Sequence, residues 1–499
     1  MLHEGAQTCF ILQNLTKFIQ VNFSIRQGDP LSMILFIIYI EPLLLYLEKN
    51  LSGLKVASIT QSVESYCDDV NIITEDLLDL PRIDTAVRKF EAMSGAILSR
   101  NYKCKVLGIG SWKGKQDWPL SYLKTETEVK IFGIFFRHNY RAIVKRNWDY
   151  RLQKFSNCLH SWSSRRMPSL SSKIEVLKIF ALTRVYYVAS VLPVPKHIIA
   201  KFESSIGKFI WRGWLLRVSI NDLKNTVSRG GLNLVCLQTM CNSLLLSQFL
   251  RLLRSADSKA IAHVVYWIGD SMCYLLPRID TTLCSDIIPE YFAYIENLVV
   301  DGRVDGVISA LDWEKVTNQM LYKVKQGNFN RTKVEVDAGK SYARVWTMLS
   351  SPVLSSPMKD IVYLLVHNKL PVRERLFRIG ISNDPYCLTC PDAPVCDMLH
   401  FFCSCVKVSA LWSWIKTIVS ELLEEVLLDT TLINFFIPKC NKEKEVAWLL
   451  GSYIEKVWND VTYQGMNAAK IDEFFGYLKF KYRMDQLGSR CSLDINAFK

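Results

Sequence analysis

The chain has 499 residues, is 49% hydrophobic and 22% charged, and carries a formal net charge of +13. This length allows about three domains, and so apolar a composition excludes an intrinsically disordered chain. The 15 cysteines are odd in number and scattered, and no secretion signal is evident, so we expect reduced thiols in the nucleus and cytoplasm.

A helix is predicted to begin at Pro30. Asp29 can cap it, and Pro30 fits the first turn. Residues 33–47 are apolar enough to raise a membrane span as an alternative, but Pro42 interrupts the run and residues 50–53 end it early. Because a helix that is apolar all round also suits a protein interior, we expect it to be buried beneath a sheet.

Two adjacent carboxylates, Asp68 and Asp69, follow a Tyr-Cys pair at positions 66 and 67. Apolar and β-branched residues on both sides, 57–64 and 70–74, predict a β-hairpin with an acidic tip. Neighbouring side chains on a straight strand point to opposite faces, so two aspartates can share one ion only at a turn. Oxygen ligands select hard cations such as Mg²⁺. The alternative is an exposed Asx turn.

Positive charge concentrates between residues 100 and 230, which hold 25 Lys+Arg against 7 Asp+Glu. Cationic grooves beside aromatic platforms suit phosphate backbones and unpaired bases, which makes RNA and DNA the expected partners. The alternative is a solvated helical face with its tryptophans in the core. The aromatic residues in question are Trp112, Trp118, Trp148, Trp162, Trp211 and Trp214.

Further helices are predicted downstream. Leucines give residues 242–255 a wide apolar face, and residues 411–428 repeat this pattern with two tryptophans. Between them, residues 256–340 carry short apolar runs broken by Asp, Gly and Pro, which indicates a connector. The tail, residues 474–499, is basic and aromatic.

One group of cysteines has the spacing of a metal site, C-x2-C-x9-H-x4-C. Three thiolates and one imidazole suffice for a tetrahedral Zn²⁺. Cys396 and Cys403 compete for the third or fourth position, and the alternative is a set of buried free thiols with a core histidine. The four predicted ligands are Cys387, Cys390, His400 and Cys405.

The order of motifs resembles the reverse transcriptase of a LINE-type (non-LTR) retrotransposon. RQGDPLS at 26–32, YIEPLL at 39–44 and YCDD at 66–69 are similar to its palm. Later stretches resemble the same family in the same order, although Ser99 replaces its usual Asn and Cys104 its usual Ser. These stretches are residues 90–107, 130–134, 161–195, 209–213 and 230–234, followed by the Cys-rich segment after 367–381.

The resemblance implies an α+β fold in which strands around Tyr66 and Val106 pack on the helix of residues 30–50. It also implies a division of the chain into five parts. These are a partial reverse-transcriptase palm (1–135), a basic helical thumb (136–255), a helical connector (256–360), a zinc-knuckle region (361–410) and a C-terminal helical region (411–499).

Roles follow from the same resemblance. Asp68 and Asp69 would be catalytic ligands of Mg²⁺ or Mn²⁺, and Phe132 and Gly133 would form the primer grip. The incoming nucleotide and the template would be bound by Arg26, Gln27, Gly28 and Lys103.

The chain departs from the family pattern at the metal site. A third Asp should precede Arg26 by several tens of residues, yet Glu4 is the only carboxylate before Asp29. We therefore expect an RNA-directed DNA polymerase fragment that cannot polymerise alone, unless a separate chain supplies the fingers, the first palm strand and the missing Asp. The alternative is a non-enzymatic RNA- or DNA-binding remnant or co-opted protein. Residues 1–110 should be the least stable part.

Overall fold

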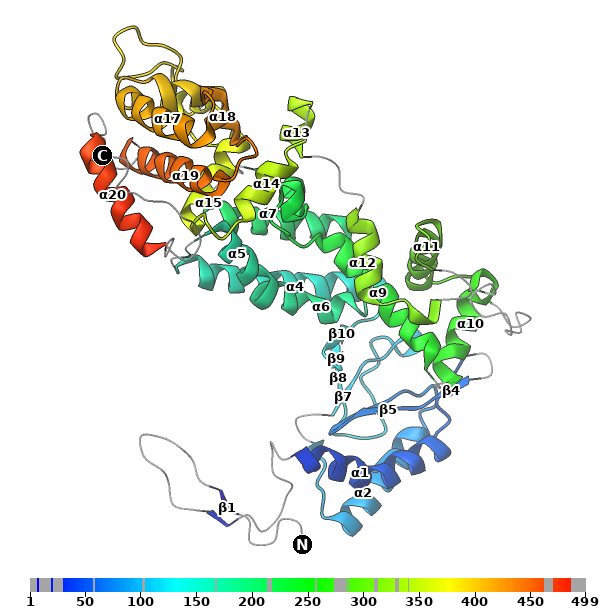
Figure 1. Cartoon of the computed structure of the whole chain (residues 1–499). Helices are drawn as coiled ribbons and strands as arrows, with labels where there is room; N and C mark the ends of the chain where they lie inside the picture. The colour runs from blue at the N-terminus through cyan, green and yellow to red at the C-terminus, as the bar shows by residue number, and fades with distance from the viewer. Residues whose placement is uncertain are drawn as a thin grey trace. The chain divides into compact units, whose positions relative to one another are not determined.

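The computed structural model describes residues 7–8, 19–20, 30–56, 59–100, 104–165, 167, 169–212, 218–255, 258–272, 285, 287–308, 313–327, 332–339, 341–461 and 470–485. It is mostly helical with a few short strands, which agrees with the α+β class (Figure 1). Contacts divide the chain into two compact units. Unit 1 is Met1–Asp149, Phe249–Val300 and Ser309–Glu314, and unit 2 is Tyr150–Gln248, Asp301–Ile308 and Lys315–Lys499.

The described strands pair only in twos. The antiparallel pairs are β1 (Gln7–Thr8) with β2 (Ile19–Gln20), β3 (Leu54–Val56) with β4 (Ile59–Gln61), β5 (Val63–Tyr66) with β6 (Asp69–Ile72), and β9 (Val129–Ile131) with β10 (Ile134–Phe136). The parallel pair is β7 (Lys105–Val106) with β8 (Lys124–Thr125). Within these residues no wider sheet forms, and the palm assignment stays a prediction.

Helix α1 (Pro30–Asn50) begins and ends where the sequence predicts. Its Leu43 and Leu47, with Leu51 directly after the helix, pack with Ala86 of α2 (Asp79–Ser94) and with apolar residues of β5 and β6. The expected burial of the whole helix is wrong, because only 6% of its most apolar 18-residue window is buried. The β5–β6 ladder is too narrow to cover more than one stripe of the helix. The length of α1 and its mean hydropathy of 1.9 also fit a membrane span. A single helix of this kind is weak evidence for one.

Two buried tryptophans and an asparagine stabilise the part of unit 1 that follows β7. Trp118 and Trp148 are 7% and 0% exposed, so for these two the core interpretation is right and the platform interpretation wrong. Asn147 accepts a hydrogen bond from Phe135 N (2.9 Å) and donates one to Phe135 O (2.8 Å), which ties β10 to the following helix. The elements wholly or partly in this unit are η1 (Gly110–Trp112), α4 (Tyr140–Ser163), α9 (Leu237–Arg254), α10 (Ser258–Met272), α11 (Glu290–Val304) and η5 (Trp313–Lys315).

Unit 2 begins with a helical layer. Ser169 caps α5 by accepting from Ser172 N at 3.1 Å, and the rings of Phe155 and Phe202 pack 4.9 Å apart between α4 and α7. The predicted helix 242–255 lies within α9. The other elements of this layer are α5 (Leu170–Val176), the π-helix η2 (Leu177–Leu182), α6 (Thr183–Ala189), α7 (Lys196–Trp211), α8 (Ile220–Lys224) and η3 (Val227–Arg229).

A second helical layer of unit 2 contains the cysteine cluster. The helix predicted over 411–428 ends at Leu423, because Glu424 adopts a left-handed conformation (φ 58°). The elements are α12 (Asn318–Gly327), α13 (Lys333–Ala338), α14 (Ala343–Ser350), α15 (Ser356–Val366), α16 (Arg373–Arg378), η6 (His400–Ser404), α17 (Ser409–Leu423), α18 (Asp429–Asn434), α19 (Glu443–Asn459) and α20 (Ile471–Met484).

Close packing of α15 on α19 forms the centre of this layer. A Cβ added at Gly451 of α19 would lie 3.0 Å from Leu354, so the glycine allows the near approach. Trp448 and Tyr453 of α19 are fully buried. The Tyr453 hydroxyl donates to Phe402 O in η6, so α19 also supports the segment that follows His400. The Cys-rich segment is thus built on a rigid helical base.

Candidate metal centre

Four side chains converge in unit 2: Cys387, Cys390, His400 and Cys405. All four potential ligand atoms lie within 4.8 Å of one another. A tetrahedral zinc ion with Zn–S bonds of about 2.3 Å and a Zn–N bond of about 2.0 Å places two sulfurs about 3.8 Å apart, and sulfur and nitrogen about 3.5 Å apart. The observed Sγ–Sγ distances from Cys405 are 4.0 and 3.9 Å, and Cys390 Sγ lies 3.5 Å from His400 Nε2. The spacing therefore fits Zn²⁺.

A short double-stranded turn presents the first two cysteines. Cys387 N donates to Pro394 O (2.8 Å) and Cys396 N donates to Pro385 O (2.9 Å), on either side of an antiparallel bridge between Tyr386 and Val395. The turn is fastened to α16 by Glu374 N, which donates to Cys396 O at 3.1 Å. This arrangement fixes the backbone of the turn that carries the two thiols.

The second half of the cluster comes from η6. His400 N donates to Asp397 Oδ1 at 2.7 Å, and Cys405 N donates to His400 O at 2.8 Å. With Nε2 facing the cysteines, Nδ1 lies 3.4 Å from Ser404 Oγ. A metal-binding histidine commonly donates its other ring N–H to such an acceptor, which fixes the ring orientation and the tautomer. Sequence reasoning missed Asp397 and Ser404; their positions at −3 and +4 from His400 were the available signal.

Electrostatics favour thiolate at one corner of the cluster. Burial raises the pKa of Cys387, but the backbone N–H groups of Thr389 and Cys390, with the side chains of His400 and Cys390, lower it to about 6. Burial raises the pKa of Cys405 to about 12, although Lys407 N–H opposes this. Val406 N also points at Cys390 Sγ (3.5 Å). N–H donors thus surround all three sulfurs and would stabilise a metal-bound thiolate set.

The two competing cysteines stand apart from this group. Burial raises the pKa of Cys396 to about 11 and that of Cys403 to about 12. Within the described residues, the converging ligand atoms are those of the other four side chains. Cys396 and Cys403 have the environment of structural thiols in a protein core.

The acidic pair occupies the predicted hairpin turn in unit 1. Tyr66 of β5 is opposite Asp69 of β6, and the turn residue Cys67 has a positive φ of 52°. Asp68 and Asp69 are exposed. No third His, Cys, Asp or Glu of the described residues joins them in a cluster. The chain as described therefore offers two carboxylates on a solvent-facing tip.

Two other segments meet this tip. Cys67 Sγ lies 3.7 Å from Met33 Sδ in the first turns of α1, and the ring of Tyr66 packs edge-on at 6.2 Å against that of Phe132. Phe132 and Gly133 form the β9–β10 turn with φ of 47° and 82°. The structure thus brings the predicted primer grip beside the acidic pair. Their catalytic roles remain predictions, and Arg26, Gln27, Gly28 and Lys103 lie outside the described residues.

Comparison with known proteins supports the origin of the chain. Residues 329–412 match the family described as zinc-binding in reverse transcriptase. A 254-residue stretch, 49% of this chain, is 26% identical to the Transposon TX1 uncharacterized 149 kDa protein of Xenopus laevis and covers 19% of that protein. The chain thus spans less than two thirds of this relative. Together with the Cys/His cluster, these matches show a relationship to the C-terminal region of a non-LTR retrotransposon reverse transcriptase, and they support Zn²⁺ as a cofactor.

Proposed function

We propose that this chain is a retrotransposon-derived nucleic-acid-binding protein of the reverse-transcriptase family. It would bind RNA and DNA through the first helical layer of unit 2, here called the basic layer (residues 150–230). Zn²⁺ would hold the Cys-rich segment in its folded conformation. The observation that carries this proposal is the charge of residues 150–230, where 14 Lys+Arg stand against 3 Asp+Glu. The expected locations are the nucleus and the cytoplasm, where nucleic acid and reduced thiols both occur.

Two ion pairs lie within this region of the described chain. Glu175 pairs with Lys178 (2.7 Å) and Glu203 pairs with Lys224 (2.6 Å). Beyond these pairs, residues 150–230 supply one further carboxylate, Asp222, and 12 further Lys and Arg residues (14 − 2). Excess charge of one sign disfavours the compact state unless something neutralises it, and a phosphate backbone does so with release of counterions.

Zinc would act here as a structural ion. Four protein ligands leave no open position for substrate or water, as in other closed sites, and the ion would join the turn at Cys387 to the η6 segment at His400. The motif after the basic layer would then stay folded on α17 and α19. This role requires no chemistry from the metal.

Polymerisation is a separate matter. Metal ions held at a polymerase site position the reacting groups and stabilise charge. If these two effects supply half of the roughly 8 kcal/mol at the low end of enzymatic acceleration, an incomplete metal site costs about three powers of ten in rate. We therefore propose that these 499 residues alone do not polymerise DNA, and that activity requires a further carboxylate to complete the Mg²⁺ or Mn²⁺ site beside Asp68 and Asp69. The second candidate is a purely non-enzymatic binder, favoured by the exposed pair without a third described ligand.

Equilibrium binding tests the proposal. Fluorescence anisotropy of a labelled 20-nucleotide RNA and of the matching DNA should show binding that weakens steeply with salt. For roughly six phosphate contacts, affinity for a single strand should fall by two to three powers of ten between 50 and 200 mM salt. Absence of binding at 50 mM salt, or binding indifferent to salt, would contradict the proposal.

A further inference from the structure

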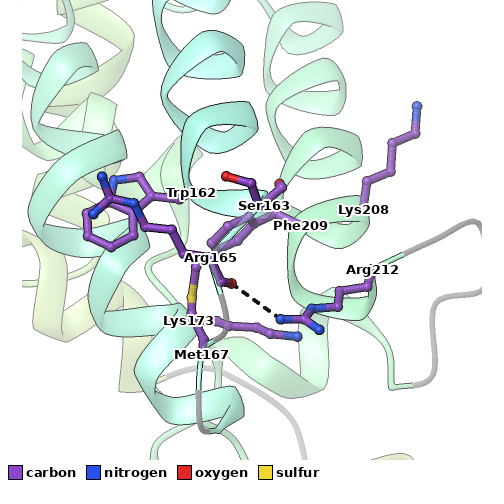
Figure 2. Close-up of a pocket in the computed structure, with 9 residues that line it drawn as sticks. Trp162, Ser163, Arg165, Met167, Lys173, Lys208, Phe209 and Arg212 are labelled. Atoms are coloured by element: carbon purple, nitrogen blue, oxygen red, sulfur yellow. Dashed lines mark hydrogen bonds between the residues drawn. The ribbon is translucent and has the colours of Figure 1, made fainter.

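A pocket of about 550 Å³ opens in unit 2 where α4 ends, α5 begins and α7 ends (Figure 2). It is separate from the cysteine cluster and from the acidic hairpin. Its lining includes four basic side chains and no acidic one. The lining residues are Trp162, Ser163, Ser164, Arg165, Met167, Lys173, Lys208, Phe209 and Arg212.

Two of the cations are held by backbone carbonyl groups. The ammonium of Lys173 donates to Ile210 O, and Arg212 Nη2 lies 3.4 Å from Arg165 O. In Figure 2 both charged ends reach the same side of the pocket, while Lys208 extends outward from its rim. Neutral carbonyls orient these groups, and no acidic side chain is among the residues that line the pocket, so the wall favours an anion.

A carboxylate that interacts with Lys173 contributes little opposing charge. Asp360 interacts electrostatically with Lys173, but burial raises its pKa to about 7, with the Leu170 N–H and Lys173 opposing the shift. It is therefore only partly ionised at neutral pH. It does not line the pocket.

The remaining wall is aromatic and apolar. Trp162 contacts Phe180, at a ring distance of 4.8 Å, and the Arg165 guanidinium, 4.4 Å from its ring centroid. Phe209 and Met167 complete this side. A guanidinium stacked on an indole offers a flat surface to a base, and the volume is ample for one nucleotide.

We infer that this pocket binds one nucleotide unit of a single strand, with its phosphodiester at Lys173 and Arg212, its base against the Trp162–Arg165 stack, and Lys208 adding positive charge at the entrance. The inference rests on the proposed nucleic-acid binding and specifies where that binding is anchored. The ordinary structural alternative is that Lys208 and Arg212 merely complement the carboxyl end of α7, where cations are favoured.

Paired variants test the inference. K208Q/R212Q removes two charges from the pocket, and the control K196Q/K201Q removes two exposed charges from the other end of α7. Binding of a labelled oligouridine is measured at 150 mM salt. We expect the pocket variant to lose roughly ten- to a hundredfold in affinity, as when charge-assisted hydrogen bonds are removed, and the control to lose much less. R212K keeps the positive charge but loses the planar guanidinium with its paired donors. Its loss of affinity should therefore lie between those of the two double variants.

Two further measurements make each outcome decisive. Inorganic phosphate and free uridine monophosphate are used as competitors; competition by the nucleotide at lower concentration than by phosphate supports a combined base and phosphate site, and equal competition overturns it. Photo-crosslinking of 4-thiouridine RNA to the wild-type chain should mark residues 160–212, whatever the variants do to folding. If the wild type binds RNA but crosslinks only elsewhere, or if both double variants lose the same affinity, the pocket inference is wrong while the proposed function stands. If the wild type binds no strand, the proposed function itself fails.

Discussion

The two predicted metal sites contrast sharply. At the cysteine cluster, four ligand atoms lie within 4.8 Å, three of the four residues are buried, and N–H groups surround the sulfurs. At the hairpin, two exposed aspartates sit on a narrow ladder beside a largely uncovered helix. Both sites were predicted from the same kind of pattern, but only the first has a complete ligand set inside the described chain.

Ligand spacing along the chain explains the difference. The cysteine site is assembled from residues 387–405, so local turns supported by neighbouring helices suffice to form it. A palm site needs carboxylates brought together from distant strands, and here the described strands pair only in twos. A local site can be complete in a fragment, whereas a site built from distant segments depends on the whole fold. We therefore expect the region around the cysteine site to be more stable than the region around the acidic hairpin.

Zinc removal should produce the largest effect. Structural zinc contributes on the order of 10 kcal/mol to the folding of small zinc modules, although a site built on α17 and α19 should lose less. We expect C387S to lose bound zinc, measured by elemental analysis of the purified protein. The segment around residues 385–408 should become sensitive to limited proteolysis.

The matched controls are C396A and C403A. Both remove a buried thiol near the cluster without removing a converging ligand, so each should retain one zinc per chain. Loss of zinc in either control, with retention in C387S, would reassign the ligands and weaken the comparison.

The second effect is a difference in local stability. Helix α19 is buried along most of its length, whereas the β5–β6 hairpin packs on a small core of leucines and Ala86. Amides of residues 446–457 should exchange about a thousandfold more slowly than those of residues 59–73, a difference of about 4 kcal/mol in opening free energy. Mass-spectrometric hydrogen exchange measures both segments in one sample. Slow exchange across residues 59–73 would show the hairpin region to be stable without a wider sheet.

The sequence predicted the local features of this molecule better than the features that depend on distant segments. Local signals worked: the start of α1 at Pro30, the hairpin at Asp68 and the cysteine spacing all appear in the structure. Predictions that depended on tertiary context did less well. The apolarity of α1 did not reveal that it lacks a covering sheet, and Trp118 and Trp148 are in the core rather than on a nucleic-acid surface. Periodicity reports which face can be buried but not what is available to bury it.

A third effect is a pH dependence of the stability of unit 2, which contains Asp360. Burial raises the pKa of Asp360 from its usual 3.8 to about 7. Because the folded state holds this proton more tightly than the unfolded state, the group's contribution is fully favourable below about pH 4 and is lost as the pH rises to about 7. D360N should remove this loss and raise the unfolding free energy at pH 8 by up to about 4 kcal/mol relative to wild type at the same pH. At pH 4 the two proteins should be equally stable.

Urea unfolding at the two pH values measures this prediction. Asp360 Oδ2 accepts from Leu170 N at 2.8 Å, and the amide oxygen of asparagine can accept the same bond, so the substitution isolates the charge. A variant that is less stable at pH 8 would mean that the carboxylate is stabilising as an anion, most directly through Lys173.

The smallest effect is expected at the acidic hairpin itself. Asp68 is exposed and lies outside the basic region, so D68A should leave RNA affinity unchanged within about twofold, because a solvated surface charge contributes little. Primer extension on an RNA template with Mg²⁺ or Mn²⁺ should be undetectable for both the wild type and D68A. Extension by the wild type that D68A abolishes would break the contrast drawn here, since it would mean that two carboxylates on this tip already form a working site. A longer chain supplying a third carboxylate should instead make extension depend on Asp68 while RNA affinity stays constant, which separates binding by the basic layer from catalysis at the hairpin.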